Sequence, residues 1–197
     1  MEYAVLVRKI NEIESKIIIE TLSKISKKGS AFFDEHQFNF YVIISKERNR
    51  VLFPKIFFVP KNIVSLYKKL SFKSKITSIG LYFGFIKQGA LFISLEGVEF
   101  LDKKDLLTEK NKIRVNKKGE KAILYGNDIL KTMLELPNRD SMHIINAEDI
   151  VIFTNKFKEI LAIGFMTENT SEFENLSSKS LIAQNLIDKG YYLREIQ

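Results

Sequence analysis

A polar stretch near the middle of the chain is the feature that most constrains its fold. Between Asp102 and Lys121 apolar residues become sparse, and lysines, acids, asparagines and Gly119 take their place. Such a stretch is typical of a domain boundary, because few buried contacts cross one. The 197 residues of the chain suffice for one large domain or two small ones. The stretch favours two, and we predict a first domain at residues 1–107 and a second at residues 108–197.

The distribution of charge differs between these two parts. The chain carries a formal net charge of +7, with 31 basic residues against 24 acids. Residues 1–107 hold 18 Lys and Arg against 11 Asp and Glu, whereas residues 108–197 hold 13 of each. The whole positive excess therefore lies in the first part, and it favours a polyanionic partner such as nucleic acid or an acidic membrane face.

Composition excludes several kinds of chemistry. Cysteine is absent, which rules out disulfides, thiolate zinc sites and cysteine nucleophiles and leads us to expect an intracellular protein. No apolar run approaches the ~18 residues of a membrane span. His36 and His143 are the only histidines, so a zinc ion would need carboxylates for most of its ligands. We expect no metal and no cofactor.

Motifs of catalysis are equally scarce. The sequence contains no G-x-S-x-G, no Walker A loop and no G-x-G-x-x-G. Asp140, Ser141 and His143 are neighbours along the chain, but a catalytic triad is assembled in space and such adjacency does not indicate one. We predict that the protein is not an enzyme.

Apolar periodicity predicts a mixed first domain. Apolar residues recur every three to five positions over Ala4–Lys27, which predicts one long amphipathic helix ending near Gly29. Gly80 and Gly84 fall in a strand-like run and indicate a bulge or close backbone packing. The other expected elements are strands at Phe38–Ser45, Arg50–Val59, Ile76–Ile86 and Ala90–Leu95, a helix from Pro60 to Leu70, and a helical turn at Glu96–Lys104.

The second domain is predicted to be a small β-rich unit. Its apolar runs are short and are separated by polar residues, as in a domain made of short strands. We expect one helix at about Gly119–Tyr125 and a second at Ser178–Lys189.

Three segments of the second domain are specific enough to carry a resemblance. They read ILYGNDILKTML (Ile123–Leu134), AEDIVIFTN (Ala147–Asn155) and LAIGFM (Leu161–Met166). Together they resemble the PUA domain of the Nip-seven family of large-subunit ribosome biogenesis proteins, and Ile76–Leu101 is similar to the segment that precedes it there. The likeness covers most of residues 56–166 and is architectural over the first fifty. Archaeal members tend to carry basic residues just after Met166, where this chain reads TENTSE.

The resemblance implies an α+β protein, with an amino-terminal α/β domain built on a mainly antiparallel sheet and a carboxyl-terminal PUA-type β pseudo-barrel. It implies RNA binding without catalysis in assembly of the large ribosomal subunit, with pre-ribosomal RNA and ribosome-assembly or exosome proteins as partners. The location would be cytoplasmic, or nucleolar in a eukaryote. Two alternatives remain open: an RNA-modifying enzyme or its accessory subunit that docks RNA through the PUA domain, and a protein adaptor whose Phe-rich first domain binds another assembly factor.

Candidate RNA contacts gather around the turn at Gly126. Glycine suits the left-handed residue that ends a helix, and its missing side chain would also let a ribose or phosphate approach. The resemblance places this turn, with Asn127, at the nucleic-acid groove. Tyr125 could stack a base or belong to the core. Lys131 interrupts an apolar stretch, where its charge must reach outward or meet an anion.

Clusters of basic residues supply the remaining candidates. One crowds the domain junction with Glu120 as the only acid among its members, and the other lies in residues 46–75. Each cluster would bind phosphates independently of the RNA sequence, although exposed lysines also keep a protein soluble. The candidates are Lys112, Arg114, Lys117 and Lys118 at the junction, together with Lys121, and Arg48, Arg50 and Lys55 in the first domain.

Overall fold

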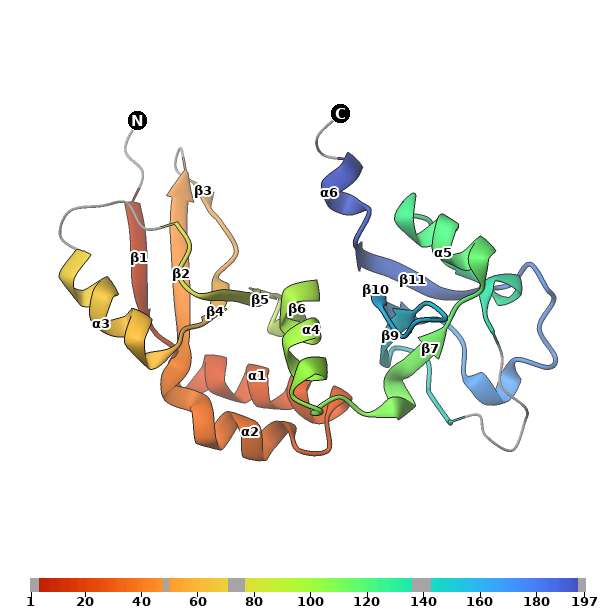
Figure 1. Cartoon of the computed structure of the whole chain (residues 1–197), viewed down its shortest axis with the longest axis horizontal. Coiled ribbons are helices and arrows are strands. Elements are labelled where there is room, and N and C mark those ends of the chain that lie inside the picture. Colours follow the sequence, from red (N-terminus) through yellow and green to blue (C-terminus); the bar gives the residue numbers. More distant parts are fainter. Residues whose placement is uncertain (1–3, 48–49, 71–76, 136–142, 195–197) are drawn as a thin grey trace. The chain divides into compact units, whose positions relative to one another are not determined.

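A computed structural model describes residues 4–47, 50–70, 77–135 and 143–194 of the chain. Its contacts divide the chain into two compact units, Met1–Leu106 and Leu107–Gln197. Each unit combines a β-sheet with helices (Figure 1), so the predicted α+β class is confirmed.

Unit 1 is built on an antiparallel sheet, as predicted. Its strand order is β1-β2-β4-β5-β6, and β3 pairs with β2. Along β2, Phe40 and Val42 face one side while Tyr41 and Ile43 face the other, and all four are buried. Both faces of the sheet are therefore covered. The strands are β1 (Ala4–Lys9), β2 (Phe40–Glu47), β3 (Arg50–Val51), β4 (Lys55–Phe58), β5 (Leu81–Lys87) and β6 (Ala90–Ile93).

Helices pack on the two faces of this sheet. Phe40 stacks against Phe33 of α2 and contacts Phe83 edge to face, so an aromatic core lies between the sheet and that helix. On the opposite face, Ile63 and Val64 of α3 pack with buried residues of β2 and β4. The helices of unit 1 are α1 (Glu12–Ile25), α2 (Gly29–His36), α3 (Lys61–Leu70) and α4 (Leu95–Lys103), with a 3-10 turn η1 (Gln37–Asn39).

The long helix predicted over Ala4–Lys27 is wrong in its first part. Ala4–Lys9 is the edge strand β1, paired antiparallel with β2. Asn11 then caps α1: its side chain accepts the Glu14 amide at 2.9 Å, and the Glu14 carboxylate accepts the Asn11 amide at 2.8 Å. This capping box fixes where the helix begins. The Arg8 guanidinium of β1 donates a hydrogen bond to the Glu14 carboxylate at 2.7 Å. This hydrogen bond raises the pKa of the Arg8 guanidinium.

Several other expectations for unit 1 are confirmed. The helix after Pro60, the β5–β6 strand pair and the helical turn after Leu95 all form. Gly84, at φ +145°, lies in a bulge where the β4–β5 register shifts, as the two glycines indicated. Helix α2 was not predicted. The first half of the strand predicted from Ile76 is not strand over residues 77–80, and Ile76 itself lies outside the described residues.

Unit 2 is a five-stranded curled sheet closed by one main helix, the PUA-type architecture that was expected. The strand order is β7-β9-β10-β11-β8, in which β7 and β9 run parallel and the other pairs antiparallel. The strands are β7 (Lys112–Arg114), β8 (Ile129–Leu130), β9 (Ile150–Thr154), β10 (Ile160–Met166) and β11 (Leu181–Asp188). The helices and turns are η2 (Glu109–Asn111), α5 (Lys117–Leu124), η3 (Lys131–Met133), η5 (Thr170–Glu172) and α6 (Tyr191–Arg194).

The helix predicted at Ser178–Lys189 is wrong, because this segment forms β11. Ile182 and Ala183 are both buried although they are adjacent, and the register with β8 shifts between Leu181 and Ala183. The irregularity breaks the two-residue alternation by which a strand is recognised in sequence.

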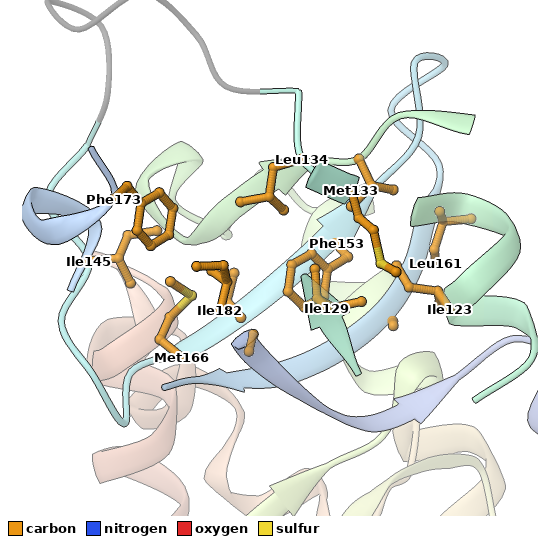
Figure 2. Packing of buried hydrophobic residues seen from close by; sticks show 14 residues of the cluster. Ile123, Ile129, Met133, Leu134, Ile145, Phe153, Leu161, Met166, Phe173 and Ile182 are labelled. Atoms are coloured by element: carbon orange, nitrogen blue, oxygen red, sulfur yellow. The ribbon is translucent and has the colours of Figure 1, made fainter. Parts of the chain in front are cut away.

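The core of unit 2 fixes the position of α5. Figure 2 shows Ile123 of α5 beside Phe153 of β9, Leu161 of β10 and Met133 of η3. At Gly119 a Cβ atom would meet the Met133 carbonyl oxygen at 2.5 Å, so the helix approaches η3 more closely than any other residue would allow. Among the described residues, no helix is long and apolar enough to cross a membrane.

The capping box of α1 yields a stability prediction. Asn11→Ala removes the side chain that accepts the Glu14 amide, and we expect unfolding of unit 1 to cost about 1 kcal/mol less free energy. Urea denaturation followed by circular dichroism measures this difference. Lys16→Ala, at an exposed position of the same helix, is the control and should change stability by less than about 0.5 kcal/mol. Equal effects of the two variants would contradict the capping role.

Candidate nucleic-acid interface

Helix α5 presents a row of cations on its exposed side. Gly119 and Ile123 are buried toward the core, whereas Lys117, Lys118 and Lys121 are exposed. Lys121 follows Lys117 by four residues and Lys118 by three, so it lies one turn further along the helix on the same side as both. We call Lys117, Lys118 and Lys121 the lysine ridge.

The beginning of the ridge is held by Asn116. The Asn116 side chain accepts the Lys118 amide at 3.0 Å and the Gly119 amide at 3.1 Å, which caps α5. Its amide group also donates to the Thr132 carbonyl at 2.8 Å. The same side chain therefore starts the helix and ties it to η3.

Tyr125 stands at the carboxyl end of the ridge. Its side chain is 66% exposed, so the alternative that it belongs to the core is wrong. The Lys121 ammonium nitrogen lies 6.0 Å from the centre of its ring. An exposed ring beside a lysine offers a flat apolar face and a cation to the same ligand.

The lysine ridge has no acidic partner of its own among the described residues. The one acid within α5, Glu120, is half-buried and accepts a hydrogen bond from Asn155 at 3.4 Å. Three like charges on one helix side repel each other. An anion bound along the ridge would relieve that repulsion.

The turn after α5 is a Schellman motif. Gly126 has φ +79°, and its amide donates to the Ile123 carbonyl at 2.8 Å. The Asn127 amide donates to the Ala122 carbonyl at 3.0 Å. These two bonds satisfy carbonyls that the helix end leaves open, so the structural explanation of Gly126 is confirmed.

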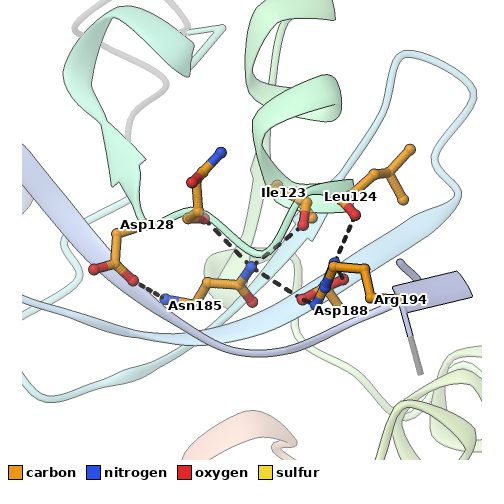
Figure 3. Close-up of polar contacts among 7 residues, drawn as sticks. Ile123, Leu124, Asp128, Asn185, Asp188 and Arg194 are labelled. Atoms are coloured by element: carbon orange, nitrogen blue, oxygen red, sulfur yellow. Dashed lines mark hydrogen bonds and ion pairs between the residues drawn. The ribbon is translucent and has the colours of Figure 1, made fainter. Parts of the chain in front are cut away.

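An ion pair between a buried carboxylate and an exposed arginine closes over this turn (Figure 3). Arg194 binds Asp188 through two contacts of 3.0 Å, and Asp188 is only 5% exposed. The same guanidinium donates to the Leu124 carbonyl at 2.6 Å. A Cβ atom at Gly126 would lie 3.0 Å from the guanidinium. The Arg194 guanidinium therefore fills the space that the missing side chain of Gly126 leaves on that side.

Asn185 completes the network. Its side-chain amide donates to the Asn127 carbonyl at 3.3 Å and to Asp188 at 3.2 Å, and its own backbone amide donates to Asp128 at 2.9 Å. Asp188, Arg194 and Asn185 were not among the residues predicted from the sequence. They lie some sixty residues or more from the helix end they hold, and no local spacing signals such a contact.

The other candidates of unit 2 have partners within the chain. The Lys131 ammonium donates to the Leu176 carbonyl at 2.8 Å. Lys112 pairs with Glu109 at 2.7 Å, and Arg114 lies 3.6 Å from Glu135. These contacts give each cation a role within the fold, and RNA contact by these three residues stays a prediction.

Two of the candidates of unit 1 lie in strands of its sheet. Lys55 is exposed at the beginning of β4. Arg50 forms part of β3 through its backbone. Arg48 lies outside the described residues.

The TENTSE segment has a structural role. The Thr170 hydroxyl accepts the Ile145 amide and donates to the His143 carbonyl, both at 3.0 Å, and the Asn169 side chain accepts the Ala147 amide at 2.9 Å. These bonds hold residues 143–147 against η5. In the described part of the chain, no group of three or more His, Cys, Asp or Glu is arranged to hold a metal ion.

Comparison with known proteins agrees with the fold of unit 2 and places this chain among proteins that contain a PUA domain. The family model described as the UPF0113 PUA domain matches residues 111–197. A UPF0113 protein of Archaeoglobus fulgidus is 30% identical over 190 residues, covering 95% of this chain and 94% of the relative. The chain belongs to the UPF0113 family, and the predicted resemblance to the Nip-seven family is confirmed.

Two further likenesses cover nearly the whole chain. The 60S ribosome subunit biogenesis protein NIP7 of Saccharomyces cerevisiae is 24% identical, covering 95% of this chain and 96% of its own. A hypothetical protein of Pyrococcus horikoshii, known from its crystal structure, superposes with a TM-score of 0.62 at 13% identity and covers 97% and 99% of the two chains. The second likeness concerns the fold alone.

Removal of Arg194 tests the network over the turn. Arg194→Ala leaves Asp188 buried without its cation and the Leu124 carbonyl without its donor, and we expect unit 2 to lose about 2 kcal/mol of stability. Hydrogen exchange in α5 should accelerate accordingly, and Arg194→Lys should lie in between because lysine cannot form the paired contact. Lys179→Ala, at an exposed site of the same unit, is the control. Unchanged exchange in α5 of the Arg194→Ala protein would show that the network does not hold the helix.

Proposed function

We propose that this protein is a non-catalytic RNA-binding factor in the assembly of the large ribosomal subunit, and that the lysine ridge with Tyr125 is where unit 2 contacts RNA. The yeast relative is called a 60S ribosome subunit biogenesis protein, and the matching family model is that of a PUA domain. The observation that carries the proposal is the exposed ridge beside an exposed tyrosine.

The ridge suits a phosphate backbone. Cations that neutralise phosphates release condensed counterions, and this release supplies most of the affinity of a contact that does not depend on sequence. Unit 2 has no net charge, but Glu109, Glu135 and Asp188 are paired with cations elsewhere in the unit. The three lysines of α5 therefore form a locally positive surface on a neutral unit.

Tyr125 adds a contact of a different kind. Unpaired bases stack on aromatic side chains, and the contact tolerates any base because every base has a flat face. Gly126 and Asn127 shape the turn beside this ring, while Lys131, Lys112 and Arg114 are secondary candidates. We propose pre-ribosomal RNA as the ligand, with ribosome-assembly proteins as further partners. Arg48, Arg50 and Lys55 of unit 1 are proposed to add phosphate contacts.

The salt dependence of RNA binding tests the ridge. For a single strand each phosphate contact contributes about 0.7 to the slope of log affinity against log salt. Replacing Lys117, Lys118 and Lys121 by alanine should therefore lower the slope by about 2, as measured by fluorescence anisotropy of a labelled oligouridylate. A triple alanine variant of Lys110, Lys156 and Lys179, three exposed lysines of the same unit, has the same charge and serves as control.

Three outcomes are distinguishable in this experiment. A large fall in slope for the ridge variant alone supports the proposal. Equal falls for the two triple variants would mean that the ridge is not a site but part of a diffuse charge. Affinity of the unaltered protein that does not change with salt would contradict binding through phosphates altogether.

Replacement of Tyr125 separates stacking from charge. Tyr125→Ala should weaken binding of the same oligonucleotide by about tenfold, the lower part of the range for one stacked base, without changing the salt slope. Tyr125→Phe keeps the ring and should bind like the unaltered protein. Phe157→Ala removes another exposed ring of unit 2, 71% exposed and beside Lys156, and should have no effect. Equal losses for Tyr125→Ala and Phe157→Ala would exclude a specific stacking position.

A further inference from the structure

A row of residues crosses three strands on one face of the unit 1 sheet. Lys55 of β4 pairs in register with Phe85 of β5, and Phe85 pairs with Phe92 of β6. Residues paired in this way point to the same side of a sheet. Two positions along β5, Lys87 pairs with Ala90 and lies on that side too.

The rings of this row form a continuous surface. Phe85 and Phe92 are stacked, with centres 5.2 Å apart and planes 10° from parallel. Phe53, which precedes β4, lies with its ring centre 5.9 Å from that of Phe85 and is 50% exposed. The Lys87 ammonium nitrogen lies 5.4 Å from the Phe53 ring centre. We call Phe53, Phe85 and Phe92 the aromatic platform.

The platform is not part of the core. Leu91 and Ile93 of β6 point to the opposite face and are only 4% and 5% exposed, whereas Phe92 between them is partly exposed, as is Phe85. Phe57, on the platform side of β4, is buried in the cluster that α3 covers. Among the described residues, the packing of α3 on this face therefore reaches Phe57 of β4 but not the platform. One exposed ring beside two partly exposed rings forms an apolar patch at the surface, and such patches mark binding surfaces in soluble proteins.

The flanking charges favour RNA over a protein partner. Neither Lys55 nor Lys87 has an acid within ion-pair distance among the residues that the structure describes. Protein interfaces are depleted in lysine at their centres, because a buried ammonium group loses its hydration and gains no equivalent contact. A surface that binds single-stranded nucleic acid instead combines both kinds of side chain. Its aromatic rings stack on the bases, and neighbouring cations bind the phosphates.

We propose that the aromatic platform stacks bases of single-stranded RNA while Lys55 and Lys87 bind the adjoining phosphates. This inference rests on the proposed RNA binding and adds to it a second contact surface with its own chemistry. The first unit then contributes more than positive charge, since it holds the bases of an unpaired segment.

The test combines a protein variant with a changed oligonucleotide. Phe53→Leu removes the most exposed ring and keeps an apolar side chain, and Phe85→Leu is a second variant of the same surface. Phe38→Leu is a matched control, because Phe38 is 66% exposed with the Lys9 ammonium nitrogen 5.1 Å from its ring centre, outside the platform. Each full-length protein is titrated with a labelled oligouridylate and with the same oligonucleotide carrying abasic sites, which keep the phosphates and lack the bases.

The expected result is specific to stacking. Phe53→Leu should bind the intact oligonucleotide about tenfold more weakly, as for loss of one stacked base, and should lose less affinity than the unaltered protein when abasic sites are introduced. Its salt slope should be unchanged, whereas the Lys55→Ala, Lys87→Ala double variant should lower the slope by about 1.4. Phe38→Leu should match the unaltered protein in every measurement, and thermal unfolding checks that all variants fold.

Other outcomes overturn the inference. If both platform variants bind like Phe38→Leu and show the full abasic penalty, the platform does not contact RNA, and a protein partner becomes the occupant to seek. In that case binding that still depends on the lysine ridge would leave the proposed function intact. Failure of the unaltered protein to bind either oligonucleotide would instead reject the proposed function and the platform together.

Discussion

The ion pair between Asp188 and Arg194 is the contact on which the carboxyl end of α5 depends. Helix α5 has eight residues, and a helix of that length is not stable alone in water. Its exposed side carries only the ridge, so its orientation must come from its two ends and its buried side. Arg194 and Asn185 bind carbonyls of the last turn and of the following loop, and Asp188 fixes both of them. A buried carboxylate, the Asn116 cap and the core contacts of Ile123 thus together orient the helix that carries the three lysines.

Local patterns predicted much of the fold. The turn at Gly126, the helix after Pro60 and the bulge at Gly84 each follow from a residue whose conformational preference acts within a few positions. Of the candidate interface, the same reasoning found the lysines of α5, Tyr125 and the turn. These are features that a short segment specifies by itself.

The wrong predictions and the residues that were not predicted have a common physical cause. Strand β1 and strand β11 exist because of partners far along the chain, and each also carries apolar spacing that fits a helix. Tertiary pairing decided between the two structures, which spacing alone could not do. Asp188 and Arg194 were missed for the same reason, since their importance comes from a helix end that only the fold brings to them. The Asn11–Glu14 capping box was a local signal that could have been found.

The topology of the unit 2 sheet has a consequence for how the protein is made. Strand β7 pairs with β9 some forty residues later, and β8 pairs with β11 some fifty residues later. Pairings over such separations form slowly, because a long loop must close first. While the chain is being translated, β8 cannot pair with β11 until residues 181–188 have left the ribosomal tunnel. The carboxyl end of α5 likewise lacks its contact with Arg194 until that residue has emerged. Unit 1, whose strands all precede residue 94, can fold while unit 2 is still being synthesised.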